Sequence, residues 1–178
     1  MTEYIVDIQS FCIINTTLAF CNTYNQCARF HCDTLARIDD VALRACGVSG
    51  NKTLALRDLA AREERGEIPT LLQMAKMDEN AIIDALVPIR GIGRWTVEMM
   101  LMFRLGRPDV LPVDDLGVRK GAQIVDKLDE MPAPKVLLAR GEKWGPYRTY
   151  ASLYLWRIVD AANAAKTKDA KPVKRSQG

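Results

Sequence analysis

The pattern of hydrophobic and polar positions predicts a succession of helices. Ile82, Ile83 and Leu86 share one face of a helix that Asp78 can cap and that Pro88 ends. After residue 33 the chain shows none of the alternation that is typical of strands. Leu, Ala, Ile and Met are plentiful, whereas aromatic residues make up only 7% of the chain. These features favour an all-α fold.

Start and stop signals give the expected limits of these helices. Asp39 and Ser49 are expected N-caps, and Gly47 and Gly66 are expected ends. The predicted helices are 39–46, 49–66, 78–87, 94–104 and 115–127, followed by two helices separated near residues 145–146. A short segment over 71–77 precedes the helix that begins at Asp78. We therefore expect a helix, a tight glycine turn and a second helix over residues 78–104.

A length of 178 residues corresponds to about one domain. Residues 33–160 show no internal repeat and no boundary that would divide them, so we expect one domain there. Residues 1–32 form a separate, divergent segment that contains four of the five cysteines, at spacings typical of neither a CxxC pair nor a zinc site. Residues 161–178 are expected to be a basic, disordered tail.

Charge and hydropathy narrow the possible partners and location. The net charge is +3, but five basic residues and one aspartate give residues 161–178 a charge of +4, so the rest is near −1. Any nucleic-acid site must therefore depend on local charges and backbone donors. Because residues 4–20 are interrupted by polar residues, they predict neither a signal peptide nor a membrane span. We expect a cytoplasmic protein without disulfides.

The segment Leu86-Val-Pro-Ile-Arg-Gly-Ile-Gly-Arg-Trp-Thr-Val-Glu98 contains the predicted turn. Gly91 and Gly93 permit positive φ and a close approach of the backbone to another molecule, and the following helix begins with unpaired N–H groups. Such a turn can hold a phosphate. An ordinary connection between two helices would also place glycine here, and the two glycines alone favour that reading.

A second motif, Leu111-Pro-Val-Asp-Asp-Leu-Gly-Val-Arg-Lys120, follows about twenty residues later. Together the two motifs resemble the helix-hairpin-helix DNA glycosylase superfamily, and within it the DNA-3-methyladenine glycosylase II branch. The segments Glu142–Ala151 and Leu153–Arg157 are similar to the closing helices of that branch. The resemblance covers about residues 33–160. Residues 1–32 do not resemble the family's usual N-terminal helical segment, which contributes to the second of the two helical lobes of the family's fold. We therefore expect that lobe to be incomplete or divergent here.

This resemblance implies an all-helical, monomeric DNA glycosylase that flips an alkylated base out of double-stranded DNA and hydrolyses its N-glycosidic bond in base excision repair. It implies Asp115 as the catalytic residue and Trp95 and Trp156 as walls of the base pocket. The DNA-binding residues would be those of the hairpin, Gly91, Gly93, Arg94 and Thr96. Bifunctional relatives have a lysine where this chain has Trp95, so the resemblance implies a monofunctional enzyme. It implies no metal ligand set and no cofactor, apart from a possible monovalent cation on hairpin carbonyls.

The chemistry of these residue types agrees with the implied roles. An ionised Asp115 at the start of a helix would stabilise the positive charge that develops on the sugar, and an indole face would attract a cationic base. A cationic base is a good leaving group, so no general acid is needed, and the single histidine, His31, lies outside the resemblance. Met99 and Leu116 stand where relatives often have further pocket aromatics, which could alter the substrate range.

Other interpretations remain open at this point. Asp114 or Asp115 could simply cap a helix, and a helical tryptophan is more often a core residue than a ligand contact. The alternative function is a helix-hairpin-helix DNA-binding module without catalytic activity. Asp115 and the two tryptophans favour the enzyme, because a binding module would need only the hairpin.

Overall fold

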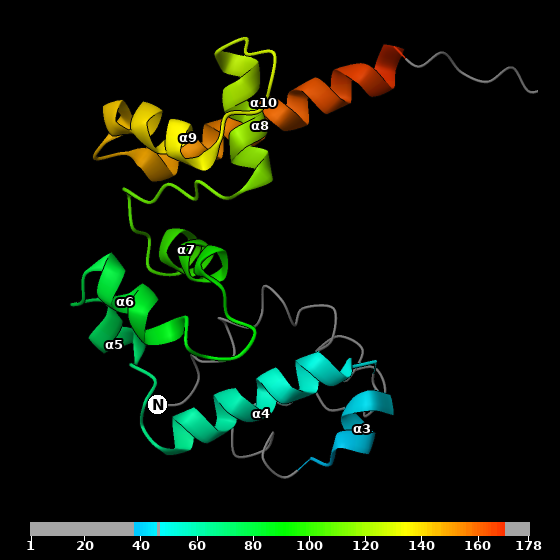
Figure 1. Cartoon of the computed structure of the whole chain (residues 1–178), viewed down its shortest axis with the longest axis vertical. Coiled ribbons are helices and arrows are strands. Elements are labelled where there is room, and N and C mark those ends of the chain that lie inside the picture. Colours follow the sequence, from blue (N-terminus) through cyan, green and yellow to red (C-terminus); the bar gives the residue numbers. More distant parts are fainter. Residues whose placement is uncertain (1–37, 46, 170–178) are drawn as a thin grey trace, which may run out of the picture. The chain divides into compact units, whose positions relative to one another are not determined.

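The computed structural model describes residues 38–45 and 47–169, and every regular element in this part of the chain is helical. This confirms the all-α expectation, while the expected N-terminal segment lies outside the described residues. In chain order the elements are α3 (Asp40–Ala45), α4 (Gly50–Glu64), α5 (Leu71–Met74), α6 (Glu79–Leu86), α7 (Arg94–Phe103), α8 (Leu116–Val125), α9 (Pro134–Gly141), the 3₁₀ turn η1 (Glu142–Trp144) and α10 (Arg148–Asp169) (Figure 1).

The predicted N-caps are confirmed by hydrogen bonds to the first turns of their helices. Asp39 Oδ1 accepts from the Ala42 N–H at 2.7 Å, and Asp78 Oδ1 accepts from the Ala81 N–H at 3.0 Å. Ser49 likewise caps α4. The sequence analysis missed one start, a reciprocal capping box at α5 in which Thr70 and Gln73 bond each other's backbone N–H. The Thr-x-x-Gln spacing is its signature.

The chain divides into two compact units after Leu105. The expectation of one domain over residues 33–160 stays a prediction, because two compact units can belong to one domain. The helical pattern continues on both sides and the connection contains only a short loop, which is why composition gives no signal at this point. Each unit is described by itself below.

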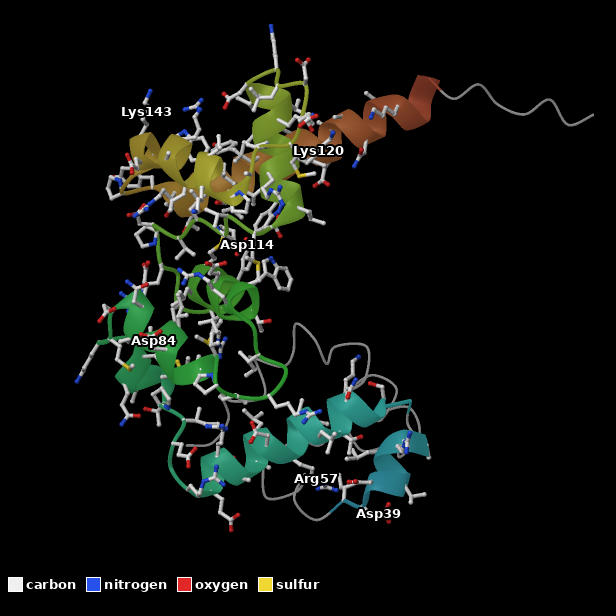
Figure 2. The ribbon with its side chains drawn as sticks, in the orientation of Figure 1. Asp39, Arg57, Asp84, Asp114, Lys120 and Lys143 are labelled. Carbon is white, nitrogen blue, oxygen red and sulfur yellow. The ribbon has the colours of Figure 1, made fainter. Side chains whose placement is uncertain are left out.

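In the first unit, α6 packs against α7. Ile82, Leu86, Val97 and Leu101 are fully buried. A smaller cluster of Leu43, Val48 and Leu56 lies between α3 and α4. An ion pair at 2.8 Å between Arg57 on α4 and Asp40 on α3 adds to this contact, next to the labelled Asp39 (Figure 2). The hydrophobic faces of the short helices thus form the core.

In the second unit, α10 crosses α8 (Figure 1). Their shared core consists of Leu111, Val118, Ala122, Leu137 and Leu155. A Cβ at Gly121 would lie only 2.4 Å from the Leu155 carbonyl oxygen, so glycine is required for the two helices to approach this closely. This crossing determines which residues of α10 lie beside the start of α8.

Helix α10 continues to Asp169, past the expected end of the folded domain at residue 160. The expectation of a disordered tail is therefore wrong for residues 161–169, while residues 170–178 lie outside the described part. Alanine and lysine dominate this stretch and are strong helix formers, so a helix that is already packed upstream extends readily through it. None of the described helices is both long enough and apolar enough to cross a bilayer.

Candidate functional site

The predicted glycine turn is an exposed loop that two buried side chains fasten to the first unit. Between α6 and α7, Ile89 and Ile92 are only 2% and 6% exposed. Arg90, Gly91 and Gly93 are exposed. The apolar side chains therefore hold the loop against the core, and its backbone faces solvent where another molecule could approach it.

The two glycines of the turn have different roles. Gly91 has φ +79°, and a Cβ there would lie 3.0 Å from the Ala55 Cβ on α4, so both its conformation and its surroundings favour glycine. Gly93 has φ −94° and ψ 166°, an extended conformation that any residue can adopt. Gly91 therefore adopts the positive φ that glycine permits, whereas Gly93, the N-cap of α7, does not.

A Cβ at Gly93 would meet no atom within 4 Å, so the protein itself does not require a glycine there. No side chain caps the start of α7. The N–H groups of this first turn are thus not satisfied by a capping side chain, which is the arrangement that helix starts use for phosphate. Both observations are consistent with close approach of a ligand to this end of α7.

The three side chains that follow Gly93 differ in their surroundings. Arg94 is exposed, but its Nε donates to Oε1 of the buried Glu98 at 3.0 Å, so part of its charge is compensated within the protein. Thr96 is half-buried. Trp95 is 38% exposed, so within its unit it is not the core residue of the alternative interpretation.

Asp115 lies at the start of α8 in the second unit and is the N-cap of that helix. Its Oδ1 accepts from the Val118 N–H at 2.7 Å. The same oxygen accepts from Nε1–H of Trp156 on α10 at 2.8 Å. Two predicted site residues are therefore in direct contact, although they are 41 positions apart. The helix-capping alternative is correct as a description of Asp115, but it does not explain the indole donor.

Gly117 provides the space that this contact needs. A Cβ at Gly117 would lie 2.6 Å from Cδ1 and 2.8 Å from Nε1 of Trp156, and 3.1 Å from Oδ1 of Asp115. The first two distances are shorter than real carbon contacts allow, so any larger residue would displace the indole. The sequence analysis quoted this glycine within the motif but gave it no role.

Trp156 is half-buried and packs against the core cluster of the second unit. The neighbouring Asp114 is exposed at the end of the loop that leads into α8, whereas Lys120 lies within the helix (Figure 2). Of the acidic pair, only Asp115 has its carboxylate bonded to Trp156. This supports the choice between the two neighbouring aspartates that the resemblance implied.

The loop before Asp115 is fastened to the start of α10 by polar contacts that sequence reasoning missed. Arg148 donates to both carboxylate oxygens of Asp109, at 2.7 and 2.6 Å, and this guanidinium lowers the pKa of Asp109. Thr149 donates its hydroxyl to the Arg107 carbonyl at 2.6 Å and accepts from the Val110 N–H at 3.0 Å. These partners are about forty residues apart, and no spacing rule could have paired them.

The structure therefore brings the predicted site residues together in two groups, one per unit. Gly91, Gly93, Arg94, Trp95 and Thr96 follow one another along the hairpin, and Asp115 contacts Trp156 beside α8. A common pocket that includes Trp95 stays a prediction. Among the residues that the structure describes, no three His, Cys, Asp or Glu side chains are grouped as a metal site would require.

Comparison with known proteins identifies the group to which these motifs belong. Residues 11–146 match the family model described as "HhH-GPD superfamily base excision DNA repair protein". The match spans both units and begins within the segment 1–32, so the likeness extends further toward the N-terminus than the expected limit at residue 33.

Two curated relatives illustrate the similarity. DNA-3-methyladenine glycosylase 1 of Schizosaccharomyces pombe is 39% identical over 72% of this chain and 57% of its own length. The putative DNA-3-methyladenine glycosylase YfjP of Bacillus subtilis is 38% identical over 72% of this chain and 44% of its own length. The chain thus spans about half the length of the curated relatives it matches.

A solved structure extends the similarity to the fold. The 3-methyladenine DNA glycosylase Mag1 of S. pombe, in complex with abasic DNA, superimposes with a TM-score of 0.69 at 34% identity, covering 88% of this chain and 74% of its own.

Proposed function

Because the chain belongs to the HhH-GPD superfamily of base excision DNA repair proteins, we propose that it is a monofunctional DNA glycosylase. Its substrates would be alkylated bases of the 3-methyladenine type in double-stranded DNA, and its reaction the hydrolysis of their N-glycosidic bond. The names of the relatives support this substrate class. The observation that carries the proposal is the Asp115 carboxylate, which accepts both a helix N-terminal N–H and the Trp156 N–H.

Asp115 is the proposed catalytic residue. Cleavage of the glycosidic bond develops positive charge on the sugar, and a nearby carboxylate stabilises that charge and can orient or deprotonate the attacking water. Two N–H donors on Oδ1 fix the orientation of the carboxylate before substrate arrives. Preorganised charge of this kind lowers the barrier because it needs no reorganisation during the reaction.

Trp156 and Trp95 are proposed to line the pocket of the flipped base. Trp156 would also position the catalytic carboxylate through its N–H, a role that goes beyond lining a pocket. A base alkylated at a ring nitrogen is cationic, and an indole face attracts it by roughly 1–2 kcal/mol in a desolvated site. The partial exposure of Trp95 leaves part of its ring accessible in its unit.

The hairpin is proposed to bind the DNA backbone through Gly91, Gly93, Arg94 and Thr96. N–H groups at the start of α7 would donate to a phosphate, and the absence of a side chain at Gly93 would let that phosphate approach. Since Arg94 is paired with Glu98, we assign most of the binding to the backbone. Contacts of this kind position DNA without reading its sequence.

A monovalent cation on the hairpin carbonyls is compatible with the hydrogen bonds of this loop. The Ile89 carbonyl accepts from the Ile92 N–H, and the Pro88 carbonyl accepts from Arg62. A carbonyl oxygen has two lone pairs, so each of these two carbonyls can still bind a cation with its second lone pair. Such a cation would add positive charge beside the phosphate. Neither it nor any cofactor takes part in the proposed hydrolysis.

The alternative, a DNA-binding module without catalysis, explains the hairpin equally well. It gives no reason for the contact between Asp115 and Trp156 or for the glycine that makes room for it. We therefore favour the enzyme, acting on DNA as a monomer in the cytoplasm.

The decisive experiment is incubation of the whole chain with methylated duplex DNA, followed by chromatography of the released bases. We expect 3-methyladenine to be released, and strands to break only after heat or alkali. Because an indole cannot form a Schiff base, borohydride should trap no covalent adduct. DNA binding without any release of bases would instead support the binding module.

A further inference from the structure

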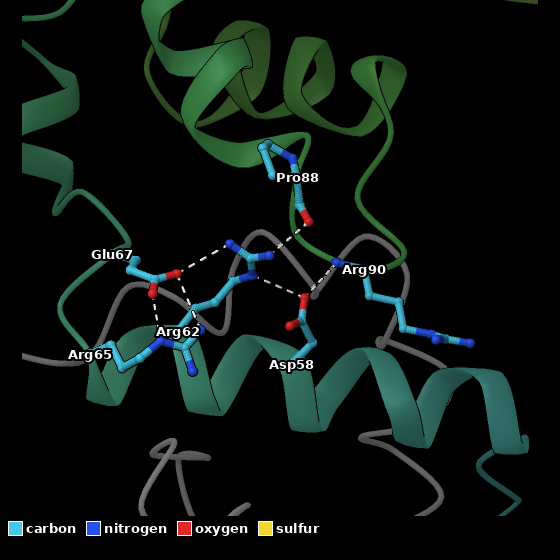
Figure 3. Close-up of polar contacts among 6 residues, drawn as sticks. All are labelled: Asp58, Arg62, Arg65, Glu67, Pro88 and Arg90. Carbon is cyan, nitrogen blue, oxygen red and sulfur yellow. Dashed lines mark hydrogen bonds and ion pairs between the residues drawn. The ribbon is translucent and has the colours of Figure 1, made fainter.

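The hairpin is connected to α4 by two hydrogen bonds that reach across the sequence (Figure 3). The Arg90 N–H donates to Oδ2 of Asp58 at 2.8 Å, and Arg62 Nη2 donates to the Pro88 carbonyl at 3.1 Å. Both Asp58 and Arg62 belong to α4, and their partners lie 32 and 26 residues further along the chain. Two successive parts of the turn are therefore fixed by side chains from outside the α6–α7 pair.

Asp58 and Arg62 also bind each other. Arg62 Nε donates to the same Oδ2 of Asp58 at 3.1 Å, so this oxygen accepts from both arginines. The pKa of Asp58 is lowered, chiefly by the Arg90 N–H and further by the Arg62 guanidinium. An ionised carboxylate accepts such bonds more strongly than a neutral group does.

The contact surface on α4 is a continuous stripe. Ala55, Asp58 and Arg62 are separated by three and four positions, which places them on one face of the helix. Ala55 lies against Gly91, where a Cβ would be 3.0 Å away. The stripe thus contacts the turn at Pro88, Arg90 and Gly91, the part of the backbone that precedes Gly93.

Electrostatic attraction to DNA does not explain why an aspartate, Asp58, lies beside the hairpin. A carboxylate beside a loop that binds phosphate weakens the binding of DNA by repulsion. Here the repulsion is offset, because Arg62 also pairs with Glu67 at 3.2 Å and Glu67 pairs with Arg65 (Figure 3). Two acids and two bases form a neutral group, which suggests that Asp58 serves geometry rather than electrostatic attraction.

We propose that Asp58 and Arg62 are positioning residues that keep the hairpin backbone in its phosphate-binding conformation. This inference rests on the proposed function of the hairpin. The pair sets the affinity for duplex DNA and leaves the bond-breaking step unchanged. Neither residue contacts DNA in this scheme, and each acts through the backbone of residues 88–91.

The test compares Asp58→Ala with Asp58→Asn. Alanine removes the acceptor, whereas the asparagine amide oxygen can still accept from both Arg90 and Arg62 without a charge. We expect Asp58→Ala to raise the Kd for undamaged duplex roughly five- to tenfold, within the range of one lost hydrogen bond of ordinary net strength. Asp58→Asn should stay within about twofold of the wild type, and the single-turnover excision rate at saturating DNA should change little in either variant.

Asp126→Ala is the matched control. This substitution also removes one carboxylate that is paired with an arginine, since Asp126 lies 2.8 Å from Arg140. Asp126, however, belongs to the second unit and lies outside the proposed site. On charge alone, all of these variants should bind DNA slightly more tightly. A weaker binding that is confined to Asp58→Ala and absent from Asp126→Ala, at comparable Tm, therefore supports positioning.

Gly93→Val separates failure of this inference from failure of the proposed function. If Gly93→Val weakens binding but Asp58→Ala does not, the hairpin binds DNA and the positioning role is wrong. Equal losses in Asp58→Ala, Asp58→Asn and Asp126→Ala, in step with Tm, would also overturn it, because they indicate general destabilisation. If Gly93→Val binds as the wild type does, the hairpin itself is not the DNA contact.

Discussion

The hairpin of the first unit and the acidic site of the second are positioned by different kinds of contact. The hairpin depends on another helix, since α4 supplies the carboxylate and the guanidinium that bond its backbone. Asp115 depends on its own helix and on one indole from α10, in a place where a glycine leaves room for it. Binding and chemistry should therefore respond to separate substitutions.

The difference follows from what each region has to present. A phosphate contact needs exposed N–H groups in a defined arrangement. The buried Ile89 and Ile92 hold the loop against the core, and the side chains of α4 additionally bond its exposed backbone. A catalytic carboxylate needs a fixed orientation and a preorganised surrounding, which a helix start and a packed indole provide.

The largest effect is expected for Asp115→Asn. The amide oxygen can still accept from Val118 and Trp156, so the site keeps its shape but loses its charge. Loss of charge stabilisation worth several kcal/mol corresponds to a fall of at least roughly a hundredfold in single-turnover excision. The Kd for duplex DNA should remain close to that of the wild type.

Asp114→Asn is the matched control for that variant, because Asp114 is the exposed neighbour of Asp115. We expect it to have a much milder effect on excision. A fully active Asp115→Asn protein, or a larger loss from Asp114→Asn, would show that the catalytic assignment is wrong.

The next largest effect is expected for Gly117→Ala. The added Cβ would lie 2.6 Å from Trp156 Cδ1, so the indole must move and its hydrogen bond to Asp115 is lost or lengthened. We expect excision to fall on the order of tenfold, comparable to the loss of one bond to a charged group. The Kd should change little, because the hairpin belongs to the other unit.

Gly121→Ala provides the contrast within the same helix. Its Cβ would meet the Leu155 backbone, which cannot yield as a side chain can. We expect this variant to lower Tm strongly, whereas Gly117→Ala should keep most of its stability because alanine favours helix. Full excision activity in Gly117→Ala would mean that the contact between Trp156 and Asp115 is not needed for the reaction.

An effect of similar size, but on binding alone, is expected for Gly93→Val. The extended backbone and open surroundings accept valine without strain, so the protein should fold normally. The side chain would occupy the space of the phosphate and raise Kd by roughly tenfold for every sequence alike, measured by titration at constant salt. Gly93→Ser, which is smaller and can cap α7, should show a lesser loss.

The sequence predicted the local features well and the contacts between distant residues poorly. Asp39, Ser49 and Asp78 were identified as caps because a cap depends only on the next three residues. The family motifs indicated Asp115 and Trp156, but their mutual hydrogen bond depends on how α10 crosses α8. The bonds from Asp58 to Arg90 and from Arg148 to Asp109 were missed for the same reason. Gly93 shows a further limit, because the sequence alone did not reveal that its backbone is extended and that its surroundings leave room for a side chain.

The smallest predicted effect is a loss of thermal stability at low pH, which tests whether the Asp58 carboxylate must be ionised to hold the hairpin. The pKa of Asp58 is lowered from 3.8, first by the Arg90 N–H. A lowered folded-state pKa gives stabilisation that is complete above the unfolded value and is lost as the pH falls through the folded value. Asp58 should therefore contribute no pH dependence to DNA binding between about pH 5 and 8. Below about pH 4, Tm should fall more steeply in the wild type than in Asp58→Asn, by on the order of one or two degrees. Identical acid profiles of the two proteins, measured by thermal unfolding, would show that the carboxylate charge is not part of the contact between α4 and the hairpin.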